Sequence, residues 1–535
     1  MKFLGIEGTA WNASASVFDE EEVVVSLVSE PYTPSDGGIH PREASEHISS
    51  HLPDVISRAV EPVESDEIGC VAFSRGPGLG PCLRNVGTAA RTAALKLDVP
   101  LVGVNHTLAH IEMGRWSSGF DDPVVLDAAG ANTLITTFRG GRYRVVGETI
   151  DTGVGNAIDK FARHVDISHP GGPKIEKLAR DGDTYVDLPY TVKGMDFSFS
   201  GIVNAAESRV DEGYELEDVA YSLQENLFSM LTEVAERGLA LTRKDELVVG
   251  GGVSRNERLR EMLNKMCMDR GAKFHAPEPR FLSDNAAMIA VTGARMYGSG
   301  QTVPVDDSYV KPDWRPDEAG IGWRESETQM EIPSGDPVDG AEAHVEFGET
   351  VSKTRLPKSY RCRELDSKIR GMRTTTEANL ISRARRAGVP TPVVLDVDLQ
   401  ESILELELIA CGEGDEPDKV CVAEDLSRYL DAGETREVGG MLANLHGDGV
   451  AHGDPTPRNF LRSDGHIYAI DFGLSFATRD VEDFAMDVYV FQQTLEGMYD
   501  SSEEMMEGFW SGYDWSGSRE VKERFENIKV RGRYL

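Results

Sequence analysis

Short apolar runs alternate with longer amphipathic stretches from residue 1 to about residue 325. Four runs, at 71–73, 101–104, 124–126 and 247–249, are short and apolar enough to predict buried strands. Residues 223–241 carry apolar positions at helical spacing and predict one long helix. This alternation of strands and helices is typical of α/β folds.

The pattern changes at residues 313–340, where Pro316, Pro333 and Pro337 interrupt a polar, acidic stretch. Prolines in a polar run are typical of a linker. A new domain of about 200 residues begins at 343–346. We therefore predict two domains, residues 1–325 and 340–535, joined by a linker at 326–339.

Composition predicts a cytoplasmic protein without a membrane span. No run of 18 apolar residues is present, and Glu7 interrupts the N-terminal segment where a signal peptide would continue apolar. The six cysteines show no C-x-x-C spacing, which disfavours a structural zinc site or a disulfide framework.

The net charge of −36 disfavours nucleic acid as a partner, because phosphate binding depends on Lys and Arg. An acidic surface adapted to high salt is the alternative interpretation, and it says nothing about partners. Local clusters of charge are therefore more informative than the total.

His106 and His110 are four residues apart, so on a helix both imidazoles can reach one cation. Two helix histidines without a ligand are the alternative. A zinc peptidase would need Glu directly after the first histidine, and Thr107 stands there, so the pattern disfavours a peptidase.

Three glycine-containing turns, at 5–9, 130–133 and 250–256, are each predicted to follow a strand. Glycine after a strand lets backbone amides approach phosphates closely. Three such turns in order favour a duplicated actin-like ATPase architecture, in which a nucleotide lies between two halves.

Four longer stretches carry a family resemblance: 73–81, 104–112, 169–173 and 283–288. Through them, residues 1–325 resemble the archaeal and eukaryotic catalytic subunit of the KEOPS complex, a tRNA threonylcarbamoyltransferase. The resemblance implies transfer of threonylcarbamoyl from threonylcarbamoyl-AMP to N6 of the adenosine 3′ of the anticodon, in tRNAs that read ANN codons.

The resemblance also implies that His106, His110 and Asp284 bind a divalent metal, with Fe²⁺ favoured and Zn²⁺ as the alternative. It implies contacts to the nucleotide-bearing substrate from nine residues: Asp127, Ala128, Ala129, Gly130, Ala131, Asp159, Gly172, Glu176 and Asn256. Without the family, Asp159 and Glu176 would be interpreted as solvated surface carboxylates.

Two positions depart from the family. Its usual Ser-Gly-Gly-Asn reads Ala129-Gly130-Ala131-Asn132 here. Asp127 stands where the family often has a metal-binding tyrosine. A carboxylate can still bind a cation, so Asp127 is a candidate fourth ligand.

A second motif, H-x-D-x-x-x-x-N, spans His452, Asp454 and Asn459, and Asp471-Phe472-Gly473 follows. This is the spacing of a kinase catalytic loop and its D-F-G. It predicts that Asp454 orients the acceptor while Asn459 and Asp471 bind Mg²⁺. Lys353 is the candidate phosphate-binding lysine and Glu377 its candidate helix partner.

This half resembles the small atypical kinase of the same complex, through residues 355–361, 387–392 and 531–533. Archaeal members often carry both proteins as one chain. No G-x-G-x-x-G loop is present, residues 340–343 stand in its place, and no A-P-E follows Asp471. Pro455 and Pro457-Arg458 depart from the family inside the catalytic loop. The resemblance implies a minimal kinase-like α+β domain.

Two basic segments are candidates to face RNA in this acidic chain. Residues 351–373 hold eight basic side chains: Lys353, Arg355, Lys358, Arg361, Arg363, Lys368, Arg370 and Arg373. The second segment is the C-terminal tail, which includes Arg531 and Arg533. A solvated helix face is the alternative for the first segment.

We therefore predict a bifunctional tRNA-modifying enzyme whose partners are tRNA, threonylcarbamoyl-AMP, ATP with Mg²⁺, and other KEOPS subunits. The kinase-like half would hydrolyse ATP to support turnover. One alternative is a regulatory serine/threonine protein kinase with an N-terminal nucleotide sensor, which the missing A-P-E disfavours. A non-catalytic scaffold is another, which the intact Asp454, Asn459 and Asp471 disfavour.

Overall fold

The computed structural model describes residues 1–21, 23–33, 39–324, 338–339, 343–410, 423–427, 429–463, 465–499 and 501–531. The chain divides into two compact units. The first comprises Met1–Thr191 and Phe197–Thr328, and the second comprises Val192–Asp196 and Gln329–Tyr534.

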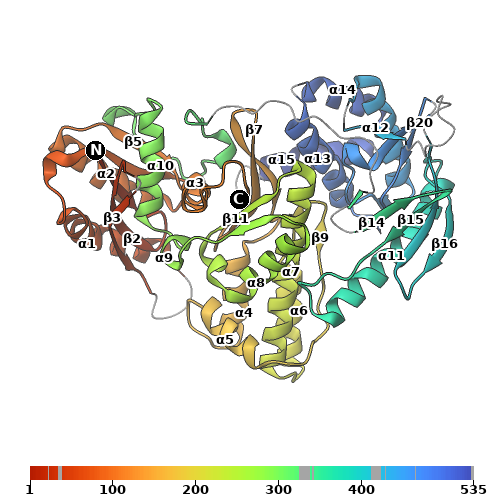
Figure 1. The fold of residues 1–535 in the computed structure, drawn as a ribbon, viewed down its shortest axis with the longest axis horizontal. Coiled ribbons are helices and arrows are strands. Elements are labelled where there is room, and N and C mark those ends of the chain that lie inside the picture. Colours follow the sequence, from red (N-terminus) through yellow and green to blue (C-terminus); the bar gives the residue numbers. More distant parts are fainter. Residues whose placement is uncertain are drawn as a thin grey trace. The chain divides into compact units, whose positions relative to one another are not determined.

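The first unit alternates strands with helices along the chain (Figure 1). Its strands are β1 (Lys2–Glu7), β2 (Asn12–Asp19), β3 (Val23–Pro31), β4 (Ile68–Gly76), β5 (Leu101–Asn105), β6 (Val124–Ala128), β7 (Thr133–Arg139), β8 (Arg142–Glu148), β11 (Glu246–Gly250) and β12 (Lys273–His275). Its α-helices are α1 (Pro41–Val60), α2 (Gly80–Leu97), α3 (His106–Ser118), α4 (Val154–His164), α5 (Gly172–Asp181), α6 (Ser200–Asp211), α7 (Leu216–Thr242), α8 (Glu257–Asp269), α9 (Pro279–Leu282) and α10 (Ala286–Gly298). Short 3₁₀ turns are η1 (Ser65–Glu67), η2 (Gly252–Arg255), η3 (Val305–Asp307) and η4 (Pro316–Glu318).

The two sheets of this unit repeat one topology. The first has the order β3-β2-β1-β4-β5, and the second, read from its other end, has the order β8-β7-β6-β11-β12. In each sheet the first three strands along the chain pair antiparallel, and the last two add in parallel. Equal order and equal direction identify two copies of one fold, the duplicated actin-like arrangement.

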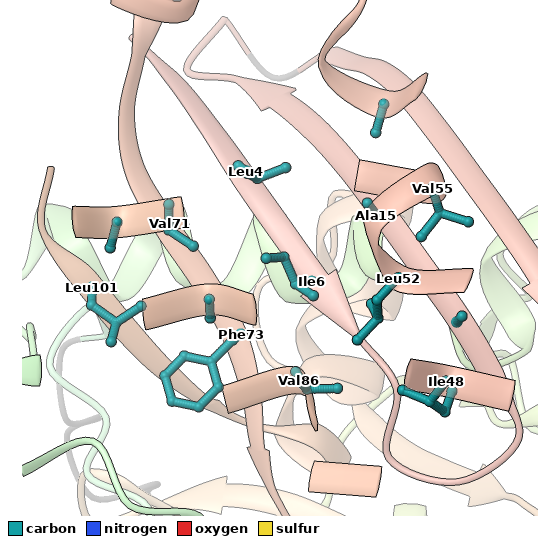
Figure 2. Packing of buried hydrophobic residues seen from close by; sticks show 14 of the residues in the cluster. Leu4, Ile6, Ala15, Ile48, Leu52, Val55, Val71, Phe73, Val86 and Leu101 are labelled. Atoms are coloured by element: carbon teal, nitrogen blue, oxygen red, sulfur yellow. The ribbon is translucent and has the colours of Figure 1, made fainter. Parts of the chain in front are cut away.

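Alternating side chains of the first sheet supply two cores, one on each face. Figure 2 shows Leu4 and Ile6 of β1 with Val71 and Phe73 of β4, packed against α1 and against Val86 of α2. The intervening residues, which include Phe3, Cys70 and Ala72, pack on the opposite face against α3 and α10. The sheet is therefore covered by helices on both faces.

Helix α3 lies between the two sheets of the first unit (Figure 1). Ala109 and Met113 pack with the first sheet, while Leu108 and Ile111 pack with Val248 and its neighbours in the second. Every residue from 107 to 114 is buried as a result. Both histidines of the H-x-x-x-H motif are on this helix, so packing from both sides fixes their position.

The second unit combines an antiparallel sheet with a helical part. The sheet has the order β13-β14-β15-β17-β16, from β13 (Val338–Asp339), β14 (His344–Phe347), β15 (Thr350–Thr354), β16 (Val394–Asp398) and β17 (Ile403–Glu407). Helix α11 (Arg363–Arg386) contacts β16 and β17. The remaining helices are α12 (Ala432–Gly447), α13 (Val481–Met498), α14 (Ser502–Gly512) and α15 (Ser518–Arg531).

The segments between the helices of this unit contain short strands and one 3₁₀ turn, η5 (Pro457–Asn459). The strands are β18 (Glu424–Asp425), β19 (Val450–Ala451), β20 (Phe460–Ser463), β21 (His466–Ala469) and β22 (Phe476–Ala477). The hairpin of β9 (Val192–Lys193) and β10 (Asp196–Phe197) completes the elements. A five-stranded antiparallel sheet, one long helix and a helical part form the predicted minimal kinase-like α+β domain.

The four predicted strands are confirmed as parts of β4, β5, β6 and β11, and residues 223–241 lie inside α7. The first predicted turn is wrong in place, because Gly5 lies within β1. A Cβ there would approach the Ala286 carbonyl oxygen of α10 to 2.4 Å, so this glycine serves helix–strand packing.

The polar stretch that begins at residue 313 is folded at its start, before the predicted linker at 326–339. Asn105 donates to the carbonyl of Trp314 at 2.9 Å, and Arg324 donates to Tyr143, so residues 313–324 are part of the first unit. Of the later linker, only residues 338–339 are described. Within the described ranges, no helix is long and apolar enough to cross a membrane.

Candidate metal, nucleotide and kinase-like sites

Helix α3 places its two histidines at its first and second turns. Asn105 precedes the helix, and its side-chain oxygen accepts a hydrogen bond from the Leu108 amide at 2.9 Å. This N-cap satisfies one of the free amides of the first turn. His106 is therefore the first helical residue, and His110 follows one turn later on the same side.

A second capped helix start holds Asp284. Asn285 caps α10 by accepting hydrogen bonds from the Ala287 and Met288 amides. The Asn12 side chain donates to the Asp284 carbonyl oxygen at 2.6 Å. The backbone on both sides of the Asp284 carboxylate is thus fixed.

The structure brings His106, His110 and Asp284 together, as predicted for a metal site. Asp284 Oδ1 lies 3.4 Å from His106 Nε2 and 3.3 Å from His110 Nε2. One ligand atom from each residue lies within 4.8 Å of the others. Two imidazoles and a carboxylate at this spacing fit one divalent transition metal ion.

Glu7 is a buried contact of His106 that the sequence did not reveal. Its side chain is fully buried, and its Oε2 lies 3.1 Å from His106 Nδ1. Thr9 fixes the other oxygen through its backbone amide and hydroxyl, each at 2.7 Å. A carboxylate behind the second imidazole nitrogen orients a metal-binding histidine and leaves Nε2 for the ion.

Opposite charges at this cluster shift the pKa values of its members. Burial raises the pKa of Asp284, but His106 and His110 outweigh it and hold that pKa well below its usual range. Burial lowers the pKa of His106, but Glu7 and Asp284 outweigh it and hold that pKa well above its usual value. The site therefore favours the ionised form of Asp284 and the protonated form of His106, which are in contact.

Asp127 is beside this cluster at the end of β6, paired with Gly250 of β11. It is 2% exposed, and its Oδ1 has no hydrogen-bond partner among the described residues. Burial raises the pKa of Asp127, and the charges of His110 and His106 offset part of that rise. A buried carboxylate oxygen without a partner is a donor atom that a cation can use.

Residues 128–131, which comprise the last residue of β6 and most of the turn to β7, are held from two sides. Gly251 has a φ of +80°, and a Cβ there would approach the Ala128 carbonyl oxygen to 2.4 Å. A Cβ on Gly153 would approach the Gly130 carbonyl oxygen to 2.4 Å. Both glycines are needed for this close backbone packing. Gly130 and Ala131 themselves are exposed.

Three of the other four predicted nucleotide-binding residues have a polar contact within the unit. Asp159 accepts from the Gly171 amide at 2.8 Å, and Gly172 begins α5 with open space around its Cα. Glu176 accepts from the Glu257 amide at 3.1 Å, and Asn256 caps α8. The structure thus gives structural roles to both carboxylates, which the sequence left as surface groups.

A polar pocket opens between α4 and α6. It lies beside the turn at 128–131, since the backbone amide of its lining residue Asn156 donates to the Gly130 carbonyl at 2.9 Å. Its lining is Thr152, Asn156, Ala157, Lys160, Arg163, Ser200 and Val203. Lys160 is paired with Asn204 and Glu207 of α6. Arg163 is exposed and has no ion pair among the described residues. The sequence analysis did not single out this pocket.

The second unit brings Lys353, Glu377 and Asp471 together. Lys353 Nζ lies 2.8 Å from Glu377 Oε1 and 2.8 Å from Asp471 Oδ1. Burial raises the pKa of Asp471, but Lys353 outweighs it and holds that pKa well below its usual range. Asp471 has a φ of +59°, a backbone conformation that is costly outside glycine and common at functional sites.

Asp454 and Asn459 face each other in the predicted catalytic loop. Asn459 Nδ2 donates to the Asp454 carbonyl at 2.7 Å and to its Oδ2 at 3.1 Å. Asp487 of α13 accepts from the amides of His452 and Gly453 at 2.6 and 2.8 Å. This buried carboxylate shapes the loop, and the sequence analysis missed it.

The basic segment at 351–373, which we predicted to face RNA, has half of its basic side chains inside the unit. Four of its eight basic side chains, on Lys353, Arg355, Arg361 and Arg373, are buried within the unit. Arg370 pairs with Asp366 at 2.7 Å. Lys353, Arg355 and Arg361 are also in ion pairs within the unit. Arg533 of the C-terminal tail lies outside the described residues. So do residues 340–342, which were predicted to stand in place of the glycine-rich loop.

A duplicated α/β unit with two histidines and a carboxylate between its halves, followed by an α+β unit with a lysine–glutamate–aspartate cluster, defines an actin-like fold enzyme joined to a kinase-like domain. A family model described as "TsaD: tRNA N6-adenosine threonylcarbamoyltransferase" matches residues 22–291. The chain belongs to this family of tRNA-modifying threonylcarbamoyltransferases.

Relatives match over the whole chain. Proteins of Halobacterium salinarum and Methanoculleus marisnigri, each described as "Probable bifunctional tRNA threonylcarbamoyladenosine biosynthesis protein", are 52% and 48% identical. The first match covers 100% of this chain and 99% of the relative, and the second covers 99% and 98%. A solved structure of T. kodakarensis HypF is 14% identical, covers 58% of this chain and 49% of its own, and has a TM-score of 0.44.

Proposed function

We propose that the cluster of His106, His110 and Asp284 and the turn at 128–131 form the transfer site of this threonylcarbamoyltransferase. The observation that carries the proposal is the convergence of three potential metal ligands at the junction of the two repeated halves. Asp127 is the proposed fourth ligand, and Fe²⁺ is favoured over Zn²⁺. When bound, such a cation supplies a Lewis acid that polarises a substrate oxygen.

In the proposed reaction, N6 of the tRNA adenosine attacks the carbamoyl carbon of threonylcarbamoyl-AMP. The new bond joins N6 to that carbon, the bond from the carbon to the phosphate oxygen breaks, and AMP leaves while N6 loses a proton. The exposed amides of Gly130 and Ala131 can donate to the phosphate. Gly172, whose Cα has open space around it, admits the nucleotide closely.

Asp159, Glu176 and Asn256 support the nucleotide through the elements they hold. Asp159 fixes the backbone that precedes α5, and Glu176 ties α5 to the start of α8. Their remaining oxygen lone pairs can accept hydrogen bonds from a ribose. Holding both reactants in this way removes the entropic cost of their encounter from the transfer step.

The experiment that tests this proposal measures threonylcarbamoyladenosine in tRNA by mass spectrometry of nucleosides. The parent chain and Asp284→Ala are incubated with tRNA, threonylcarbamoyl-AMP and the partner subunits of the complex. We expect the variant to lose both bound metal and transfer. Full metal occupancy and full transfer in Asp284→Ala would contradict the assignment. Asp306→Ala, at an exposed carboxylate in η3, serves as the control.

We further propose that the second unit hydrolyses ATP in support of this reaction. Asn459 and Asp471 would hold Mg²⁺, Lys353 would bind the phosphates, and Asp454 would orient the attacking water or hydroxyl. The 2.8 Å contacts of Lys353 with Glu377 and Asp471 support this proposal. A serine/threonine protein kinase is the alternative, and a comparison of ATP turnover with phosphate transfer to added proteins distinguishes the two.

A further inference from the structure

The carboxylate of Glu377 is held by two cations, one at each oxygen. Lys353 contacts Oε1 at 2.8 Å, and the Arg355 guanidinium donates a short hydrogen bond to Oε2. Glu377 is fully buried, and Arg355 is 2% exposed. In the usual kinase arrangement the lysine alone pairs with this glutamate. Arg355 is therefore an additional, fully enclosed partner.

Arg355 also ties the end of β15 to helix α11. Its backbone amide donates to the Ser402 carbonyl at 3.1 Å, which anchors it beside β17. Its Nη1 lies 3.4 Å from the Thr374 hydroxyl, one turn before Glu377 on α11. A planar guanidinium that contacts two successive turns restricts both rotation and sliding of the helix.

The same guanidinium lies against the loop that carries Asp471. A Cβ added to Gly473 would lie 2.6 Å from Arg355 Nη2 and 3.6 Å from Glu377 Oε2. The absence of a side chain at Gly473 therefore lets the arginine reach the glutamate. Arg355 thus touches strand, helix and Mg²⁺-binding loop at one point.

Charge balance shows what this arginine adds. Lys353 and Arg355 carry two positive charges, and Glu377 and Asp471 carry two negative charges. When a nucleotide binds, its phosphates attract Lys353 and Mg²⁺ takes Asp471. Without Arg355, Glu377 would then be a buried carboxylate that shares its only cation with the ligand, which is costly. With Arg355, it keeps a partner of its own.

Protein kinases commonly set the position of this helix through a phosphorylated activation segment. Here α13 begins at Val481, eight positions after Gly473, and no A-P-E follows. We propose that Arg355 is a positioning residue that holds α11 permanently in the nucleotide-binding position, so that this ATP site needs no activation segment. This inference rests on the proposed ATP hydrolysis by the second unit.

The test compares steady-state ATP hydrolysis by the full chain, its Arg355→Gln and Arg355→Met variants, and Arg355→Lys. Loss of the cation should raise KM for ATP and lower kcat/KM by about 10- to 100-fold, the range implied by removing a partner from a buried charge. Arg355→Lys keeps the charge and should recover most of that loss. Arg383→Gln, at a surface arginine of α11 paired with Asp448, should match the parent.

Parent values of KM and kcat/KM in the glutamine or methionine variant would overturn the proposal. A second result would also overturn the proposal: KM stays unchanged, and kcat per mole of protein falls only as far as the unfolded fraction rises. That result would show that Arg355 stabilises the fold and does not position the helix. Should the methionine variant fail to fold, the glutamine and lysine variants decide.

A parallel comparison with Asp471→Ala tests the proposed function separately. If the parent turns over ATP no faster than Asp471→Ala, ATP hydrolysis is wrong. Binding of a fluorescent ADP analogue without Mg²⁺ then decides the role of Arg355, since weaker binding to Arg355→Gln supports it and equal binding overturns it.

Discussion

Glu7 illustrates how one buried side chain can control a site whose ligands are elsewhere in the chain. It lies 99 positions from His106 and contacts the imidazole nitrogen that faces away from Asp284. Because Thr9 holds the other carboxylate oxygen, Glu7 has little freedom to turn. The orientation of His106 therefore depends on a residue of the first strand.

We expect Glu7→Gln to weaken metal binding about 10- to 100-fold, the usual effect of removing a carboxylate behind a metal-binding histidine. The fold should be preserved, because the amide keeps the size of the side chain and removes only its charge. Metal titration followed by elemental analysis measures the change. Glu20→Gln, at an exposed carboxylate, is the control, and equal affinity in the two variants would refute the role of Glu7.

Replacing Asp127 should change the stability of the metal-free protein and its affinity for metal in opposite directions. Because burial raises its pKa, the ionised carboxylate destabilises the metal-free fold at neutral pH. Asp127→Asn should therefore raise the melting temperature of the metal-free protein. The same change should weaken metal binding by at least about tenfold if Asp127 is a ligand.

Thermal unfolding with and without added metal measures both effects on Asp127→Asn. A ligand that binds only the native state raises the melting temperature, and the gain grows with the logarithm of its affinity. A higher metal-free melting temperature with an undiminished gain from metal would show that Asp127 is buried but does not bind the ion.

Helix α4 carries basic side chains whose contact with tRNA phosphates can be tested. Lys160 and Arg163 line its pocket next to the turn at 128–131, and the exposed Arg163 has no ion pair among the described residues. In the proposed transfer site the acceptor adenosine approaches that turn, and the phosphates that flank the adenosine need cations in this acidic chain. The buried arginines of the 351–373 segment are not available for this purpose.

Arg163→Glu should therefore weaken tRNA binding and flatten its dependence on log[salt] by about 0.7–0.9 for each phosphate that the variant no longer neutralises. Binding across a salt series measures both quantities. Arg42→Glu makes the same charge change at an exposed position of α1 and should leave the slope unchanged. Equal slopes for the two variants would exclude this face of α4 from the RNA interface.

Local patterns predicted the elements well and the contacts between distant elements poorly. The strands at 101–104 and 247–249 were predictable because apolar runs of that length have few other uses. Gly5 was misplaced because its reason is the approach of α10, which is distant in sequence. Glu7, Arg355 and Asp487 look like ordinary charged residues until folding brings their partners to them. The proposed metal ligands came from family resemblance, since spacing alone left two interpretations for the histidines.

At the scale of the molecule, the two chemistries belong to different units. Asp284 and Asp471 lie in separate compact units, each with its own core and its own charge balance. We expect Asp471→Ala to abolish Mg²⁺-dependent ATP hydrolysis and keep the metal of the first unit. Asp284→Ala should lose the metal of the first unit and keep Mg²⁺-dependent ATP hydrolysis. Elemental analysis and ATP turnover on both variants check this, and loss of both properties in either one would contradict it.

The repeated topology of the first unit has an evolutionary consequence. Helix α3 directly follows the last strand of the first sheet, and α10 follows the last strand of the second sheet after the short α9. Each begins after a capping asparagine, and the two helices contact each other. The histidines come from the start of one and Asp284 from the start of the other. A site shared by equivalent positions of two copies is what a symmetric dimer of half-length ancestors would have possessed. Gene fusion would then have freed each copy to diverge, one toward imidazole and the other toward carboxylate.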